Sequence, residues 1–226
     1  MKRFNIFNQI HKALRAALYD TALTLQQTSF EEEDQAAMAL EKVNLVADLF
    51  DKHAGHEDHF IIPAIQQYEP SVADAFEQEH VEDHALGQKL RGLLLSFEHA
   101  VSTEEKIIAG QALTNCFIHF MTFNLTHMAK EEVVLNELLW RYYNDGELLA
   151  LNHKIVTSIP AAEAVVAQAW MMRGLSNTEI IAWLRAVEKS SPEFIFNALF
   201  ASAEKELPPV RFRQVLEGLT NGVLVA

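Results

Sequence analysis

Hydrophobic side chains recur at spacings of three and four residues along this chain as far as about residue 143, and that period is helical. The first stripe predicts a helix over residues 4–27, and a second helix follows it to about Pro63. Two further stripes run over residues 73–94 and 113–135. Glycine and proline, which interrupt helices, number only 8 and 6 among 226 residues. The pattern predicts an all-α protein built on four long amphipathic helices.

Helix-start and helix-stop residues divide the chain. Three of the predicted starts have a serine three positions before an acidic residue, at Ser29 with Glu32, Ser71 with Asp74, and Ser102 with Glu105. Asp145-Gly146 is predicted to stop the fourth helix. Beyond it prolines and glycines come closer together, which favours four or five short helices between 147 and 223. We therefore predict a domain over 1–145 and a helical C-terminal extension over 146–226.

Charge and cysteine content exclude several classes of protein. A net charge of −13 opposes binding to nucleic acids or anionic membranes, so we expect neither partner. The single cysteine, Cys116, rules out an intrachain disulfide and an iron–sulfur cluster held by cysteine thiolates. The sequence has no run of 18 apolar residues, so we expect no membrane span. His11, Lys12 and Arg15 interrupt any apolar leader sequence. These features favour a cytoplasmic protein.

Histidines and glutamates stand inside the apolar stripe of each long helix. In chain order they are His11, then His53 with Glu57, then His80 with His84, then His127 with Glu131. A step of four residues rotates only about 40° around an α-helix, so each pair faces the same way. Burying such groups without partners costs roughly 1–3 kcal/mol each, and a metal ion removes that cost. Imidazole and carboxylate donors together suit iron, manganese or zinc.

The number of donors fits two metal ions. Any one of these histidines alone is more often a buried structural residue, but the ordered set on four successive helices favours a metal site. If both carboxylates bridge and an oxide or hydroxide completes the bridge, the ion with three histidines is six-coordinate. The ion with two histidines is then five-coordinate. It keeps an open position for dioxygen, nitric oxide or peroxide.

The ordered set resembles the hemerythrin-like, HHE cation-binding family over roughly residues 4–143. The matching stretches are residues 10–15 (IHKALR), 53–63 (HAGHEDHFIIP), Glu79-His80 with His84, and 127–132 (HMAKEE). The resemblance implies an up-and-down four-helix bundle with a non-haem di-iron site that binds dioxygen reversibly or reacts with related small oxidants. It also implies that His80, His84 and His127 hold one iron, that His11 and His53 hold the other, and that Glu57 and Glu131 bridge. The C-terminal extension resembles helical extensions of some bacterial members.

Several alternatives remain open at this point. Some family members take the last carboxylate from the fifth residue after the histidine, which is Glu132 here, although that position lies about 140° around the helix and geometry favours Glu131. Manganese or zinc are substitutes for iron. The protein is a carrier, store or sensor of dioxygen, or a di-iron oxidoreductase that handles peroxide, nitric oxide or iron repair, or a metal-dependent regulatory module. The extension serves packing, a partner surface or a homodimer.

Overall fold

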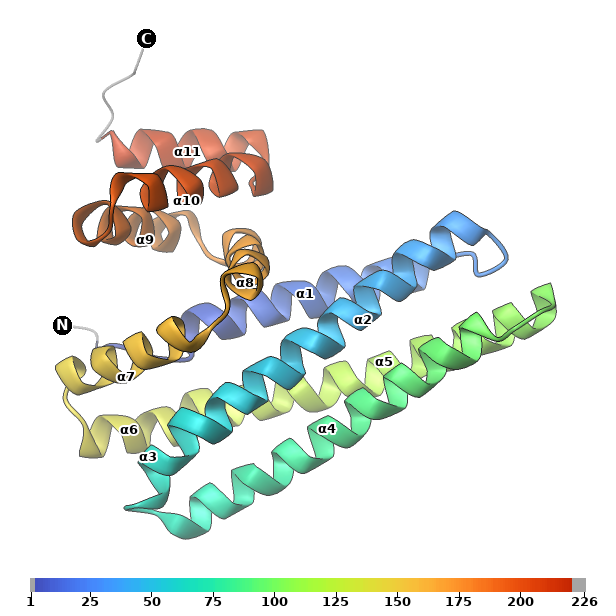
Figure 1. The fold of residues 1–226 in the computed structure, drawn as a ribbon, viewed down its shortest axis with the longest axis horizontal. Coiled ribbons are helices and arrows are strands. Elements are labelled where there is room, and N and C mark those ends of the chain that lie inside the picture. Colours follow the sequence, from blue (N-terminus) through green and yellow to red (C-terminus); the bar gives the residue numbers. More distant parts are fainter. Residues whose placement is uncertain (1–2, 221–226) are drawn as a thin grey trace. The chain divides into compact units, whose positions relative to one another are not determined.

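A computed structural model describes residues 3–220, and every regular element in that range is helical, which confirms the all-α prediction. The long helices are α1 (Asn8–Gln27), α2 (Glu33–His56), α4 (Pro70–Glu98) and α5 (Thr103–Lys130) (Figure 1). The shorter elements are η1 (Glu57–Ile61), α3 (Ile62–Gln66), η2 (Glu131–Leu135), α6 (Asn136–Tyr142), α7 (Asp145–Ser158), α8 (Ala161–Gly174), α9 (Asn177–Ser190), α10 (Glu193–Glu206) and α11 (Pro209–Leu219). Within residues 3–220, no single helix is long and apolar enough to cross a membrane, and α7 and α8 meet that criterion only as a pair.

The described chain forms two compact units. Unit 1 comprises the residues up to Asn8 together with Ala17–Ser158, and unit 2 comprises Gln9–Ala16 together with the residues from Ile159 onward. Helix α1 is therefore divided between the units. Helix α7 groups with unit 1, although the predicted boundary at residue 145 assigned it to the extension. Two separate domains stay a prediction.

In unit 1, α4 packs along both α2 and α5, and α3 packs against α4 and α6. Figure 1 shows that α4 runs antiparallel to each of its two long neighbours. Lys42 on α2 donates a hydrogen bond of 2.6 Å to Asp20 and one of 2.8 Å to Thr24, so the second half of α1 lies beside α2. The long helices of unit 1 thus surround a shared interior.

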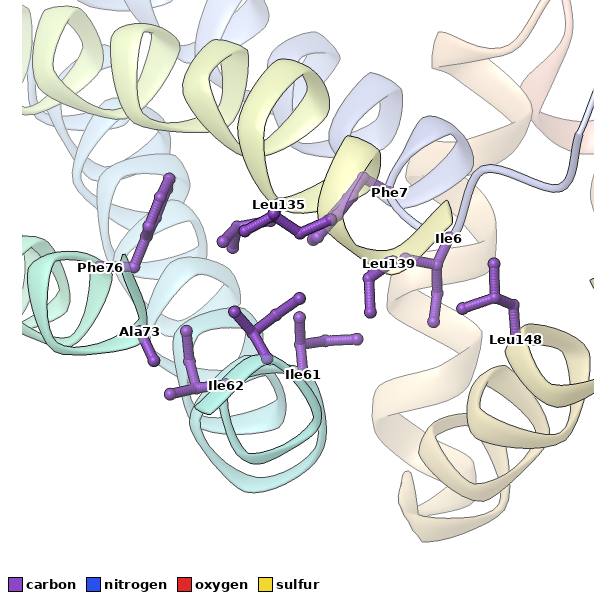
Figure 2. Close-up of a cluster of buried hydrophobic side chains, with 11 residues drawn as sticks. Ile6, Phe7, Ile61, Ile62, Ala73, Phe76, Leu135, Leu139 and Leu148 are labelled. Carbon is purple, nitrogen blue, oxygen red and sulfur yellow. The ribbon is translucent and has the colours of Figure 1, made fainter. Parts of the chain in front are cut away.

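An apolar cluster fills one end of unit 1 (Figure 2). Ile61 and Leu135, the last residues of η1 and η2, point into it together with Ile62 and Leu139 from the helices that follow. The other buried members are Ile6, Phe7, Ile65, Ala73, Phe76, Leu138 and Leu148. Because apolar burial is the main stabilising contribution to folding, this cluster fixes the ends of α2, α4 and α5 relative to one another.

The predicted helix start at Ser102 is confirmed. The Ser102 hydroxyl accepts a hydrogen bond from the Glu105 backbone N–H at 3.2 Å, and the Glu105 carboxylate accepts one from the Ser102 backbone N–H at 2.9 Å. The start predicted at Ser29 is wrong, because α2 begins at Glu33 with no side-chain cap. The Ser29 backbone N–H instead donates to the Gln35 side chain at 3.1 Å.

The stop predicted at Asp145-Gly146 is also wrong. Helix α6 ends earlier, at Tyr142, and Asp145 is the first residue of α7. Asn144 and Glu147 exchange side-chain and backbone hydrogen bonds of 2.8 and 3.1 Å, which satisfy N–H groups at the start of α7. A residue pair that favours turns therefore opens a helix, because Asn144 supplies a cap.

In unit 2, four short helices recur at equal spacing, with first residues at 161, 177, 193 and 209. Their N-cap residues are Pro160, Ser176, Pro192 and Pro208. Helix α8 packs against α10, and α9 packs against α11. The apolar core between them contains Met172, Leu175, Ile180, Leu184, Leu199, Ala203, Leu207 and Val215. The predicted succession of short helices is confirmed.

Candidate metal centre

Buried histidines and glutamates of unit 1 meet in its interior. The ligand atoms of Glu57, His80, His127 and Glu131 all lie within 4.8 Å of one another. Those of His53, Glu57 and Glu131 meet the same criterion, so the two groups share both glutamates. All five residues are at most 9% exposed. We call them the metal cluster.

The carboxylate of Glu57 lies between two imidazoles. Its Oε1 is 3.2 Å from Nε2 of His53, and its Oε2 is 3.5 Å from Nε2 of His80. Glu131 Oε1 is 3.1 Å from Nε2 of His127 and 3.8 Å from Nε2 of His80. Two donors that each lie about 2.1 Å from one ion are roughly 3.0–3.5 Å apart, so most of these separations match shared coordination.

Two imidazole nitrogens in the metal cluster have no hydrogen bond. Within residues 3–220, the buried Nε2 atoms of His80 and His127 find no partner of suitable geometry. Their Nδ1 atoms contact carboxylates, at 2.5 Å from Asp58 and 2.8 Å from Glu79. Because an ionised carboxylate accepts and does not donate, these contacts place a proton on Nδ1, so Nε2 is the nitrogen that can coordinate a cation once its own proton has left. The donor set therefore fits a metal ion.

Glu79 connects the metal cluster to the surface. Its Oε1 accepts a hydrogen bond of 2.6 Å from the exposed Lys130 ammonium, while its Oε2 faces His127. Burial raises the pKa of Glu79, but hydrogen bonds from Lys130 and His127 outweigh that effect and hold the pKa below its ordinary value. Glu79 is therefore ionised and acts as an acceptor for the His127 imidazole. Asp58 likewise contacts the Nδ1 atom of His80, from a more exposed position.

The electrostatics of the metal cluster favour positive charge. Burial lowers the pKa of His80, but the nearby carboxylates of Glu131, Glu57 and Asp58 outweigh it and raise the pKa to about 11. The pKa of His127 is also raised, since Glu131 and Glu79 outweigh its burial. Protons on these imidazoles neutralise the buried carboxylates in the way that bound cations would. A metal must displace them.

Both glutamates of the metal cluster open a π-helical turn. The Ile62 N–H bonds to the Glu57 carbonyl and the Asn136 N–H bonds to the Glu131 carbonyl, each five residues back. On α2 and on α5, two successive steps of four residues lead from a histidine to a glutamate and then to a buried apolar residue. In a regular α-helix these two steps would turn the apolar side chain away from the face that the histidine occupies. The wider π turn cancels that rotation. Glutamate and the following apolar residue can then both face the interior.

The two candidate last carboxylates differ in burial. Glu131 is fully buried and belongs to the metal cluster, whereas Glu132 is only half-buried. The distortion begins at Glu131, so the four-residue step from His127 remains in regular helix. The geometry of the metal cluster thus agrees with the choice that helical rotation favoured.

The structure does not bring His84 into the metal cluster. Its side chain is 64% exposed, and its Nδ1 lies 3.4 Å from Asp51. The buried residues of α4 alternate in steps of three and four, as Ala73, Phe76, His80, Asp83, Gly87, Leu90, Leu94 and Phe97. The step after His80 is therefore three residues, to Asp83. Reading the stripe backward from Leu94 and Leu90 would have found Asp83, which sequence reasoning missed.

Asp83 is a buried carboxylate beside the metal cluster. The residue is 4% exposed, and its Oδ1 accepts a hydrogen bond of 2.6 Å from the Asn124 amide. Burial raises the pKa of Asp83, and the Asn124 hydrogen bond and the nearby His127 only partly oppose that rise. Asn124 is itself 1% exposed and lies one turn before His127 on α5.

The remaining histidines near the motif have different environments. His11 is fully buried in α1, in the stretch of that helix that belongs to unit 2. His56 is half-buried and His59 is exposed, with its ring edge against Phe60 at a centroid distance of 4.6 Å. Neither His56 nor His59 belongs to a candidate metal group within the described residues.

No protein-family model matches this chain, and no curated protein is significantly similar to it in sequence. The assignment therefore depends on the arrangement of the residues themselves. Every regular element of residues 3–220 is helical, and buried histidines and glutamates in that range are close enough to hold a metal ion. Those two properties are compatible with a hemerythrin-like fold.

Proposed function

We propose that this chain is a hemerythrin-like non-haem di-iron protein that binds dioxygen or a related small molecule reversibly. The observation that carries the proposal is Glu57, which directs one carboxylate oxygen at His53 and the other at His80. A carboxylate in that position is suited to bridging two ions. In this proposal α1, α2, α4 and α5 form an up-and-down four-helix bundle around the ions.

The proposed ligands divide between the two irons. His80 and His127 would hold one, His53 and His11 would hold the other, and Glu57 and Glu131 would be shared by both. His11 is included because of its place in the motif and because its imidazole is fully buried. Two ferrous ions supply the electrons that reversible dioxygen binding takes up. Manganese or zinc would fit the same donors, but zinc has no redox chemistry.

The protein's own residues hold the ligands still and keep water away. Asp58 and Glu79 orient the imidazoles of His80 and His127. Phe76 and Phe123 cover His127, with ring centroids 5.8 and 6.0 Å from its own. An apolar covering of this kind limits solvent access, which favours reversible binding over loss of the oxidised product to water.

The test is a spectrum recorded through an oxygen cycle. Full-length protein is purified without chelators, loaded anaerobically with ferrous ion, exposed to air and then placed under vacuum. We expect about two irons per chain and a charge-transfer band that appears in air and disappears under vacuum. Zinc-loaded protein is the control and should show no band. A band that never reverses contradicts carriage and favours turnover of oxidants, and about one ion or none per chain contradicts a di-iron centre.

A second candidate, a metal-dependent regulatory module, is favoured by contacts within unit 2. Lys12 forms an ion pair of 2.6 Å with Glu179, which also caps α9 through Ser176. A side chain at Gly174 would collide with the backbone carbonyl of Lys12. The stretch that contains His11 is therefore held by α8 and α9. Metal binding at His11 would then change the packing of α8 and α9 on that stretch.

Limited proteolysis tests this second candidate. Metal-loaded and metal-free protein should be cleaved at different rates between residues 159 and 220. Gly174→Ala should increase cleavage there, because the new methyl group displaces the Lys12 backbone. Gly92→Ala is the matched control, since a side chain at Gly92 meets no atom within 4 Å. Identical cleavage of loaded and metal-free protein contradicts regulation through these helices.

A further inference from the structure

Asp83 and Asn124 form a polar layer next to the metal cluster. Asp83 lies three residues after His80 on the buried stripe of α4, and Asn124 lies three residues before His127 on α5. Because α4 and α5 pack together along their length, these two residues form the next layer of the interior. Their side chains meet at 2.6 Å.

A carboxylate this deeply buried requires strong compensation. Its only hydrogen-bond donor among the described residues is the Asn124 amide, which also donates to the Phe120 carbonyl at 3.1 Å. The imidazoles of His127 and His80 act on Asp83 only through their charge, and both belong to the metal cluster. One neutral amide does not offset the cost of burying a charge, which is several kcal/mol in protein interiors. A cation one helical turn away would offset it.

We propose that Asp83, not His84, is the ligand that α4 adds to His80 at the ion held by His80 and His127. This inference rests on the proposed metal function. Asn124 holds the Asp83 carboxylate one turn from the metal cluster, and ligation requires the carboxylate to turn away from Asn124. His84 is excluded because its imidazole lies on the surface beside Asp51.

The substitution changes the chemistry of that ion. With Asp83 it would have two imidazoles, two shared carboxylates and one terminal carboxylate, so five protein donors would leave a sixth position for the bridging oxide or hydroxide. A hard, anionic oxygen donor in place of an imidazole stabilises the ferric over the ferrous state. The site would therefore favour oxidation more than a site with five histidines. The expected substrate class is small oxidants that accept electrons readily, such as dioxygen or peroxide.

A direct comparison of neighbouring variants tests the assignment. Asp83→Asn, His84→Ala and Glu82→Gln are prepared in the full chain, where Glu82→Gln is an exposed carboxylate-to-amide control on the same helix. Iron affinity is measured by competition with a chromophoric chelator. Asp83→Asn should weaken one of the two ions by at least about 100-fold and shift the absorption spectrum, a larger loss than the roughly 10–100-fold expected when a group that only contacts a ligand is removed. His84→Ala and Glu82→Gln should bind as wild type. Wild-type affinity and spectrum in Asp83→Asn, or loss of an ion in His84→Ala, overturns the inference.

A measurement on the unchanged protein covers the case in which Asp83→Asn fails to fold. Cobalt(II) is substituted for iron, and the sample carries ¹³C-labelled aspartate carboxyls and ¹⁵N-labelled imidazoles. We expect one strongly shifted aspartate carboxyl and a His84 imidazole without a contact shift. A contact-shifted His84 together with no shifted aspartate contradicts the inference. Failure of the wild-type chain to bind any metal instead removes the proposed function, so the two failures are distinguishable.

Discussion

Three helices carry a pair of candidate ligands four residues apart: a His–Glu pair on α2, another on α5, and a His–His pair on α4. Only in the two His–Glu pairs do both side chains face the interior. His53 and Glu57 face the interior together, and so do His127 and Glu131. His80 faces it while His84 lies on the surface. The difference lies in the backbone. A π turn follows each buried glutamate, whereas α4 is regular helix throughout.

A four-residue step keeps two side chains on one face only if the whole stripe follows that step. On α4 the apolar residues on either side of His80 alternate between steps of three and four, and this alternation turns Asp83 inward. After α2 and α5 the π turn keeps the residues of two consecutive four-residue steps on the same face. Ligand spacing therefore predicts a shared face less reliably than the apolar residues on both sides of it.

The largest effect should come from removing a π turn. Deletion of His59, an exposed residue inside η1, would restore α-helical hydrogen bonding and rotate Ile61 and the following residues by about 100°. We expect loss of metal binding and a fall of about 2–5 kcal/mol in the free energy of unfolding, because buried apolar side chains leave the cluster of Figure 2. Denaturant unfolding and metal analysis measure both. Full retention of metal would show that the turn does not position Glu57.

The next largest effect should follow from neutralising the shared carboxylates. Glu57→Gln and Glu131→Gln each remove a donor common to both groups, so each variant should bind both ions at least about 100-fold more weakly. Calorimetric titration with ferrous or zinc ion provides the measurement. Glu132→Gln is the matched control, because that half-buried neighbour lies outside the metal cluster. An equal loss in Glu132→Gln would contradict the assignment of Glu131.

A smaller effect should come from the outer carboxylates. Asp58→Asn and Glu79→Gln keep shape but weaken the acceptors of the His80 and His127 imidazoles. Metal affinity should fall by about 10–100-fold without loss of the second ion. Glu77→Gln, on the same helix as Glu79, should leave metal affinity unchanged. If both outer variants bind metal like wild type, the imidazoles are held by packing alone.

The most gradual effect is a slope of stability with pH in metal-free protein. The pKa of His80 rises from 6.5 to about 11 on folding, and that of His127 also rises, so the folded state binds more protons than the unfolded state. Their stabilisation is complete below about pH 6.5 and is lost as pH rises toward 11. The melting temperature should fall across that range, by roughly 2–4 °C for each 1 kcal/mol lost. Zinc-loaded protein should show a flatter profile, and equal slopes would contradict displacement of these protons by metal.

The sequence alone predicted the helical class and the inward glutamates, because apolar periodicity and a four-residue step are local properties of a helix. It did not predict the π turns, since they depend on the packing of Ile61 and Leu135 in a cluster formed by distant segments. It misplaced His84 for a related reason. Which of two adjacent residues faces the interior of α4 depends on the register that Leu90 and Leu94 set against α5.

Anomalous diffraction from crystals of the iron-loaded full chain would locate the bound ions themselves. We expect two anomalous peaks roughly 3.5–4 Å apart, with the Glu57 carboxylate between them and His80 and His127 on the same ion. A single peak, or peaks bound to surface histidines while Nε2 of His80 and His127 coordinates nothing, would contradict it.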